Sequence, residues 1–331
     1  MKEILTELIE HRSLSKDTAR QVLIDLASGK HNPSQVSAFM TVYMMRTVTL
    51  EELQGFRDAM LELCLPVRFD EPVMDVCGTG GDGKNTINLS TLSSFVVAAA
   101  GQPVAKHGNY GVSSVSGSSN VLEYFGYRFT NNPETLKRSL DSANIFFMHA
   151  PLFHPAMKNV APIRKELGVK TFFNMLGPMV NPAQPPRQLV GVFNLELARQ
   201  YGYLYQSTNK QFCVLHDLQG YDEVSLTGPC KVFTNQGEFV WHPQMFDLPV
   251  IDAKDIQGGR TVEESAKLFL EILRGKGTRA QHSVVAANAG LALYTGGQAK
   301  SLPDAVALAL DTLQSGKALE TFHKLMAINP S

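Results

Sequence analysis

The sequence predicts an α/β protein made of a small all-helical domain and a larger α/β domain with a mostly parallel central sheet. Up to about residue 65 the spacing of apolar residues is helical, whereas short apolar runs alternate with helical segments after residue 73. Such alternation is typical of a parallel sheet covered by helices. Residues 261–327 return to a helical pattern with short loops. We therefore expect a helical domain at residues 1–66 and an α/β domain at residues 67–331.

Local signals predict where the first helices begin and end. Apolar residues within 22–26 share one helical face, and Gly29 stands where this helix would end. The dipeptide Asn32-Pro33 marks a second start, because proline is well tolerated at the first helical position. Thr49 followed by Glu52 has the spacing of a capping box, which marks a third start.

Five short apolar runs have the composition of buried strands. They are residues 73–77, 104–105, 145–147, 189–192 and 212–215. Helices are expected between them, over about 91–100 and 195–205. The tripeptide Asn235-Gln236-Gly237 separates two β-rich runs, which predicts a hairpin turn.

The composition is that of an ordinary soluble globular protein. The 331 residues include 30 Lys or Arg and 31 Asp or Glu, for a net charge of −1, and 44% are hydrophobic. This length is ample for a large core. The absence of a basic excess argues against a dedicated nucleic-acid binder.

The remaining sequence features favour a cytoplasmic protein without a membrane segment. The four cysteines, Cys64, Cys77, Cys213 and Cys230, form no C-x-x-C pair, which argues against a zinc site or a disulfide framework. The first residues mix acidic and apolar side chains, unlike a signal peptide. No run of about 18 apolar residues is present, so we expect no transmembrane span.

The densest chemical signal is the segment DVCGTGGDGKNTINLST, residues 75–91. It places four glycines between a predicted strand and a predicted helix. Glycines let successive backbone N–H groups point at one spot, which binds anions, and the start of a helix adds positive potential there. The segment lacks both the P-loop and the G-x-G-x-x-G patterns. It predicts a phosphate or pyrophosphate site, with a plain turn as the alternative.

Two further clusters follow predicted strands. Lys106-His107-Gly108-Asn109 precedes a serine-rich stretch at residues 113–119, and a lysine among small donors suits a polyphosphate pocket. A serine-rich surface loop is the alternative, and His107 alone would be structural. The adjacent carboxylates Asp222 and Glu223 suit Mg²⁺, which prefers one or two carboxylates together with phosphates and waters. A solvated turn is the alternative there.

In this order and spacing, these motifs resemble the anthranilate phosphoribosyltransferase family. Residues 154–182, HPAMKNVAPIRKELGVKTFFNMLGPMVNP, also resemble that family closely, and the similarity extends over most of the chain. The resemblance implies a fold of the nucleoside phosphorylase and phosphoribosyltransferase type, in which about 155–180 join the helical domain. It also implies a homodimer with its active site in a hinge cleft.

The resemblance further implies the reaction and its participants. The phosphoribosyl group of phosphoribosyl pyrophosphate would pass to the amine of anthranilate, in tryptophan biosynthesis, with two Mg²⁺ per monomer and no nucleic-acid or membrane partner. No residue is assigned as an obligatory general base.

By position, the resemblance assigns three groups of residues. Phosphoribosyl pyrophosphate would contact Gly78, Thr79, Gly80, Gly81, Asp82, Thr86, Asn88, Leu89, Ser90, Thr91, Lys106, His107, Gly108, Asn109 and Ser118. Anthranilate would contact Gly78, Asn109, His154, Arg164 and Gly177. The metal ligands would be Ser90, Asp222 and Glu223.

Three positions depart from the family pattern, and two other functions are considered. Tyr110 and Val115 stand where the family often has basic residues, and Asn120 where it usually has aspartate. They lower the charge of the loop that would close over the phosphates. A pyrimidine nucleoside phosphorylase-like enzyme and a non-catalytic nucleic-acid-binding relative are the alternatives. The acidic pair together with Asn88-Leu89-Ser90-Thr91 suits a metal-bound pyrophosphate better than a single phosphate, which disfavours the first. Retention of Asp222, Glu223 and Arg164, with a net charge of −1, disfavours the second.

Overall fold

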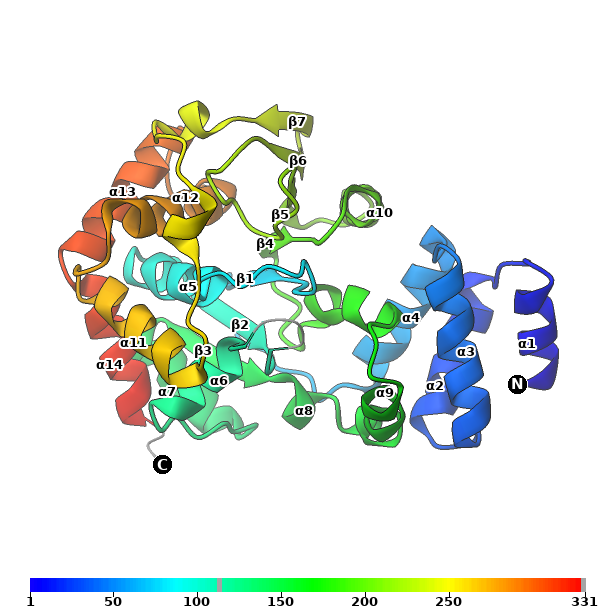
Figure 1. The fold of residues 1–331 in the computed structure, drawn as a ribbon. Helices are drawn as coiled ribbons and strands as arrows, with labels where there is room; N and C mark the ends of the chain where they lie inside the picture. Colours follow the sequence, from blue (N-terminus) through cyan, green and yellow to red (C-terminus); the bar gives the residue numbers. More distant parts are fainter. Residues whose placement is uncertain (112–114, 329–331) are drawn as a thin grey trace. The chain divides into compact units, whose positions relative to one another are not determined.

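The computed structural model describes residues 1–111 and 115–328. The chain divides into two compact units, and each unit contains two separate stretches of sequence (Figure 1). The first consists of residues 1–67 and 150–184, and the second of residues 68–149 and 185–331.

The first unit is helical. Its helices are α1 (Lys2–Ile9), α2 (Lys16–Ala27), α3 (Pro33–Met45), α4 (Leu50–Leu63), α8 (Ala150–Phe153) and α9 (Ala161–Leu167). Short 3₁₀ turns lie at Pro155–Asn159, Phe172–Met175 and Gly177–Val180. The predicted starts of α3 and α4 are confirmed, because Asn32 accepts a hydrogen bond from the Gln35 amide and Thr49 forms a capping box with Glu52. Each cap satisfies amide groups that have no partner within the helix.

An aromatic cluster explains why residues 150–184 belong with the N-terminal helices. The ring of Phe172 lies 4.6 Å from that of Phe56 on α4 and 5.9 Å from that of Phe39 on α3. All three side chains are fully buried. Burial of large aromatic rings stabilises such a core strongly, so the two stretches share one hydrophobic interior.

The second unit is a sheet covered by helices. Its strands are β1 (Met74–Gly78), β2 (Val104–Gly108), β3 (Ile145–His149), β4 (Arg187–Gly191), β5 (Gln211–Asp217), β6 (Cys230–Thr234) and β7 (Gly237–Trp241). Its helices are α5 (Leu89–Ala99), α6 (Ser118–Tyr124), α7 (Pro133–Ala143), α10 (Leu195–Gln206), α11 (Val262–Leu273), α12 (Arg279–Thr295), α13 (Leu302–Gln314) and α14 (Lys317–Ile328).

Within the described residues the strands form one sheet in the order β3-β2-β1-β4-β5-β6-β7. The strands from β3 to β5 are parallel, whereas β6 and β7 are antiparallel additions joined by the predicted hairpin turn. Helices α5 and α12 pack on one side of the sheet, and α10 packs on the other (Figure 1). The predicted α/β fold class with a mostly parallel sheet is confirmed.

The parallel arrangement determines where chemistry can occur. Strands β1, β2 and β4 all end in glycine, at Gly78, Gly108 and Gly191. The carboxyl ends of parallel strands lie at one edge of the sheet, where open α/β folds bind ligands. All four cysteines are buried and free. No helix among the described residues is long and apolar enough to cross a membrane.

Candidate active site

The glycine-rich loop connects the end of β1 to the start of α5. Gly80, Gly81 and Gly83 have φ values of +63°, +79° and +74°, in the left-handed region that disfavours side chains. Glycine at these positions lets the loop turn sharply beside the first turn of α5. The predicted arrangement of strand, glycine loop and helix start is confirmed.

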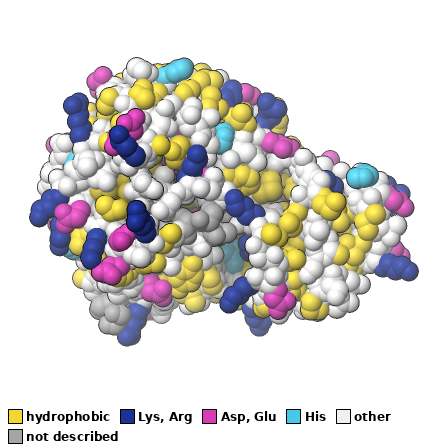
Figure 2. All heavy atoms as spheres, in the orientation of Figure 1, with side chains coloured by type: hydrophobic (Ala, Val, Ile, Leu, Met, Phe, Trp, Pro, Cys, Tyr) yellow, Lys and Arg dark blue, Asp and Glu magenta, His cyan; other side chains and the backbone are white. Residues whose placement is uncertain are grey.

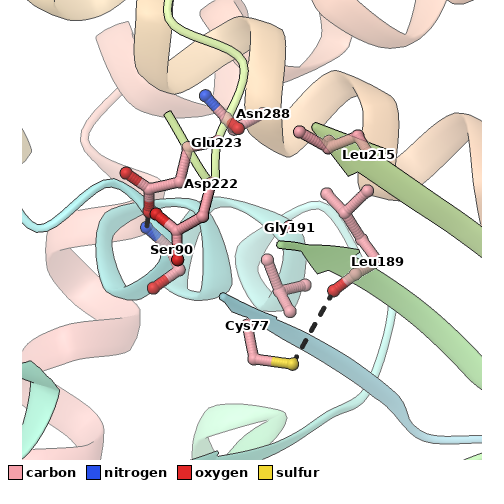
Figure 3. A pocket seen from close by; sticks show the side chains of 9 residues that line it. Cys77, Ser90, Leu189, Gly191, Leu215, Asp222, Glu223 and Asn288 are labelled. Atoms are coloured by element: carbon pink, nitrogen blue, oxygen red, sulfur yellow. Dashed lines mark hydrogen bonds between the residues drawn. The ribbon is translucent and has the colours of Figure 1, made fainter. Parts of the chain in front are cut away.

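The acidic pair lies directly against this loop. The Gly80 amide donates a hydrogen bond of 2.6 Å to Asp222 Oδ2, and the Ser90 amide donates one of 2.9 Å to Glu223 Oε1. Thr86 Oγ1 is 3.5 Å from Glu223 Oε2. Figure 3 shows both carboxylates directed toward Ser90. The loop and the N-terminus of α5 therefore direct their N–H groups at the carboxyl oxygens of the acidic pair.

Two neighbouring glycines allow the acidic pair to approach this closely. Gly78 and Gly191 are paired across β1 and β4. A Cβ atom on Gly78 would lie 2.4 Å from Asp222 Oδ2, and one on Gly191 would lie 1.5 Å from the Asp222 carbonyl oxygen. Because both distances are far below a van der Waals contact, only glycine fits beside Asp222 at either position.

Burial and mutual repulsion disfavour the charged forms of the acidic pair. Burial raises the pKa of Asp222 to about 7, and the nearby Asp82 contributes in the same direction. Burial, followed by the charges of Asp222 and Asp82, raises the pKa of Glu223. A divalent cation would relieve this repulsion, and carboxylate and hydroxyl oxygens are the donors that Mg²⁺ prefers.

The described residues contain no cluster of three His, Cys, Asp or Glu side chains arranged as a complete metal cage. An ion held by two carboxylates would take its other ligands from phosphate and water. The chemistry of Asp222, Glu223 and Ser90 therefore fits a magnesium ion that binds together with a phosphorylated substrate.

Lys106 is a buried basic group whose charge acts on Glu223. Only 2% of the residue is exposed, and its Nζ donates a hydrogen bond of 2.8 Å to the Val76 carbonyl. Burial lowers its pKa, while the charges of Asp75, Cys77 and Glu223 act in the opposite direction. The lysine thus lies inside the α/β unit, bonded to β1, rather than on the outer surface.

A second loop follows β2 and contacts the start of α5. Asn88 Nδ2 donates a hydrogen bond of 2.8 Å to the Ser116 carbonyl. The Asn109 carbonyl accepts hydrogen bonds from the Ser118 hydroxyl at 3.3 Å and the Ser119 amide at 3.2 Å. The structure therefore brings the two predicted clusters together. Residues 113 and 114, which belong to the predicted serine-rich stretch, lie outside the described residues.

The positions that depart from the family pattern bring no charged side chain to this loop. Asn120 Oδ1 accepts from the Gly111 amide at 3.0 Å and from the Gly117 amide at 2.9 Å. Tyr110 Oη donates to Glu123 at 3.2 Å, whereas Val115 is exposed. An amide oxygen thus links the two sides of this loop without a charged side chain.

Several predicted contact residues can act only through their backbone or from within the core. Leu89 and Thr91 are buried in the first turn of α5, and His107 is buried on β2. The Thr79 amide donates to the Gly191 carbonyl at 2.9 Å, which joins the glycine loop to β4. Gly108 is in close contact with Ser118, because a Cβ there would lie 2.3 Å from the serine hydroxyl.

The other predicted anthranilate residues belong to the helical unit. His154 is buried, and burial lowers its pKa to about 4, so its ring is neutral at pH 7. Arg164 lies on α9 with its guanidinium carbon 4.9 Å from the centre of the Phe173 ring, and burial lowers its pKa. Gly177 is exposed at the start of a 3₁₀ turn. Gly78 and Asn109 belong to the α/β unit.

Sequence reasoning missed two residues that shape this site. Gly191 gives no motif of its own, because its importance comes from the backbone of Asp222, which is distant in sequence. Asn288 lines the same pocket as the acidic pair (Figure 3). The sequence does contain a signal for Asn288, because it is the one polar side chain in the run Val284–Leu293, which otherwise consists of apolar residues and glycine. A buried amide in such a run requires hydrogen-bond partners.

The comparisons with known proteins cover nearly all of the chain. Residues 70–319 match the family described as "Glycosyl transferase family, a/b domain", and residues 2–64 match its helical bundle domain. An anthranilate phosphoribosyltransferase of Flavobacterium psychrophilum is 57% identical over 99% of this chain and 100% of its own length. The enzyme of that name from Bacteroides thetaiotaomicron is 49% identical over 99% of each chain.

The chain belongs to the anthranilate phosphoribosyltransferase family. The resemblance read from the motifs is thereby confirmed. Solved structures agree. The anthranilate phosphoribosyltransferase of Thermus thermophilus covers 98% of both chains with a TM-score of 0.91 and 34% identity. That of Saccharomyces cerevisiae, in complex with phosphoribosyl pyrophosphate and Mg, has a TM-score of 0.89 and 26% identity, covering 98% of this chain and 96% of its own.

Proposed function

We propose that this chain transfers the phosphoribosyl group of phosphoribosyl pyrophosphate to the amine of anthranilate. The products are N-(5-phosphoribosyl)anthranilate and pyrophosphate, and the reaction serves tryptophan biosynthesis in the cytoplasm. The observation that carries the proposal is the acidic pair, Asp222 and Glu223, held by amides of the glycine loop and of α5. This arrangement combines an anion site with a cation site, as a metal-bound pyrophosphate requires.

The proposed site for phosphoribosyl pyrophosphate lies at the carboxyl ends of β1 and β2. The backbone of residues 78–82, the start of α5 and the segment 106–109 with Ser118 would hold its phosphates. Ser90, Asp222 and Glu223 would hold two Mg²⁺ ions, consistent with the raised pKa values of the two carboxyls. Bound Mg²⁺ supplies a positive charge that stabilises the departing pyrophosphate.

The protein contributes mainly by positioning and by electrostatic stabilisation. When the bond between the ribose carbon and pyrophosphate breaks, negative charge grows on the pyrophosphate, and the proposed loop contacts would stabilise it. The aromatic amine of anthranilate is neutral at pH 7 and attacks the ribose carbon as the bond from that carbon to the pyrophosphate oxygen breaks. The nitrogen, positively charged once the new bond has formed, then releases a proton to water. A strong general base is therefore unnecessary, and we assign none. Correct alignment of the two reactants alone can lower the barrier by several kcal/mol.

For anthranilate we propose contacts with Gly78, Asn109, His154, Arg164 and Gly177. The planar guanidinium of Arg164 matches a carboxylate with two parallel hydrogen bonds. Its contact with Phe173 restrains it in one orientation. Because His154 is neutral, it offers a hydrogen bond or an apolar ring edge without adding charge beside the substrate.

We also propose that the chain acts as a homodimer through its helical unit. Large apolar side chains are exposed there, including Ile9 on α1 with 66% exposed and Met45 on α3 with 83% exposed. Figure 2 shows hydrophobic side chains on the visible face of this unit. Exposed apolar groups gathered on helices are typical of a surface that a second subunit covers. Sedimentation measurements would test this, and a monomer at micromolar concentration would contradict it.

Neutral substitution of the acidic pair tests the proposed function. Asp222→Asn combined with Glu223→Gln keeps the size of both side chains but removes the charge that would hold Mg²⁺. We expect turnover to fall by at least about 100-fold, with loss of the response to added Mg²⁺. Glu263→Gln on α11 removes an exposed charge paired with Lys267 and serves as the control, with unchanged activity. Full activity in the double variant would refute the metal assignment.

A further inference from the structure

Asn288 is a buried amide in the middle of helix α12. Only 4% of the residue is exposed, and its neighbours from Val284 to Leu293 are buried as well. A polar side chain in such surroundings is stable only when its donors and acceptor are paired. The partners of this amide therefore indicate why a core helix contains it.

The partners lie in the loop that carries the acidic pair. Asn288 Oδ1 accepts a hydrogen bond of 3.0 Å from the Val224 amide, and Asn288 Nδ2 donates one of 2.8 Å to the Val224 carbonyl. The second Nδ2 hydrogen bond, also 2.8 Å, goes to the Val284 carbonyl within α12. The side chain thus pairs with both backbone groups of the residue that directly follows Glu223. Figure 3 shows Asn288 next to Glu223.

Hydrogen bonds among its own residues also stabilise this loop. Asp217, at the end of β5, accepts hydrogen bonds from the Ser225 hydroxyl at 2.6 Å and from the Ser225 amide at 3.1 Å. Its own amide donates to the Tyr221 carbonyl at 3.1 Å. These contacts define the shape of the loop but do not connect it to the helices beside it. Asn288 connects it to α12.

Helix α12 in turn packs against α5, which provides Ser90. The Ser93 hydroxyl, one turn after Ser90, is 3.5 Å from the Val285 carbonyl of α12. One helix therefore contacts both the segment that supplies Glu223 and the helix whose first turn receives it. Helix α12 thus contacts both partners of the 2.9 Å hydrogen bond between the Ser90 amide and Glu223 Oε1, through the residues beside them.

We infer that Asn288 is a positioning residue for the metal-binding carboxylates, acting through the backbone of Val224. The inference rests on the proposed function, because it assigns a role toward the Mg²⁺ site proposed above. Loss of the amide would leave two buried backbone groups without partners, and the loop would move to find others. Groups that hold metal ligands in place commonly change metal affinity by about 10- to 100-fold when they are removed.

The test compares Asn288→Leu with Val285→Ala, a core substitution on the same helix that leaves Val224 paired. Mn²⁺ binding is measured by electron paramagnetic resonance in the presence of phosphoribosyl pyrophosphate, alongside the KM for anthranilate and the thermal unfolding midpoint. We expect Asn288→Leu to weaken Mn²⁺ binding by at least about tenfold, with the anthranilate KM within about twofold of wild type. Val285→Ala should lower the unfolding midpoint but leave Mn²⁺ binding unchanged.

Unchanged Mn²⁺ binding in Asn288→Leu, or an equal loss in Val285→Ala, would overturn the inference. Asn288→Ser gives the same test if the leucine variant does not fold, because a serine hydroxyl is too short to reach both groups of Val224. Mn²⁺ binding by the wild type distinguishes a failure of this inference from a failure of the proposed function. If phosphoribosyl pyrophosphate fails to promote Mn²⁺ binding in the wild type, the proposed metal site itself is wrong.

Discussion

Replacing Gly191 with alanine tests how closely the acidic loop must approach the sheet. The added Cβ would lie 1.5 Å from the Asp222 carbonyl oxygen and 2.4 Å from its carbonyl carbon. Both neighbours are backbone atoms, so no side-chain rotation relieves the clash. The loop would have to move by about 2 Å to restore an ordinary van der Waals contact, since repulsion rises steeply when two atoms lie closer than such a contact.

A movement of that size would remove the alignment of the metal ligands. The hydrogen bond from the Gly80 amide to Asp222 is only 2.6 Å long, and it breaks well before the loop has moved so far. A misplacement of about 1 Å in an active site can reduce the rate by about 100-fold. We therefore expect Gly191→Ala to lower kcat by at least about 100-fold at saturating substrate.

The assay is the loss of anthranilate fluorescence, with circular dichroism to confirm that the variant is folded. Gly202→Ala on α10 is the matched control, because its Cβ would first meet the Phe233 ring at 3.0 Å, where a side chain can adjust. The control should keep activity within about twofold of wild type, because alanine also favours a helix more than glycine does. A folded Gly191→Ala variant with more than about one third of wild-type kcat would refute this account of the loop, since the misplacement should cost far more.

Two further predictions concern the helical unit. Arg164→Ala should raise the KM for anthranilate by at least about tenfold and leave that for phosphoribosyl pyrophosphate within about twofold, because a charge-assisted hydrogen bond to one substrate is lost. Arg164→Lys should restore only part of the affinity for anthranilate. Steady-state kinetics of Arg164→Ala that show no change in either KM would contradict the role proposed for Arg164. Burial would raise the pKa of Glu52, but hydrogen bonds from Arg46 and from the Leu14 and Thr49 amides outweigh it and lower the pKa below the ordinary 4.5. Its contribution to stability is therefore present above pH 4.5 and is lost as the pH falls through the lowered value. Glu52→Gln should reduce the free energy of unfolding by about 3 kcal/mol or more at pH 7 and flatten its acid dependence in denaturant titrations, whereas an unchanged profile would exclude this assignment.

Local signals in the sequence predicted most elements of the fold. The caps at Asn32 and Thr49 depend on hydrogen bonds within three residues, so they form wherever those residues occur. The strand at residues 145–147 was predicted because its side chains are apolar, and β3 is buried along its full length. The start of β4 was missed, because Arg187 and Gln188 are polar and form a strand only through pairing with β1 and β5.

The residues of the candidate site also fall into two groups, those that the sequence predicted and those that it did not. The glycine loop and the acidic pair were found because each is contiguous in sequence and has a recognisable chemistry. Gly191 and Asn288 were not found, because each acts on a backbone segment at least 31 residues away in the chain. A close approach between distant segments leaves no local pattern. Only the folded arrangement shows that a methyl group at one position, or an apolar side chain at the other, would displace Asp222 or Glu223.

The most direct test of the central claim is a fluorescence assay with single omissions. Purified protein is mixed with anthranilate, phosphoribosyl pyrophosphate and Mg²⁺, and the anthranilate signal is followed over time. We expect the signal to decay only when all four components are present, with one pyrophosphate released per anthranilate consumed. Absence of decay in folded protein that still binds phosphoribosyl pyrophosphate would contradict the assignment of anthranilate as the acceptor.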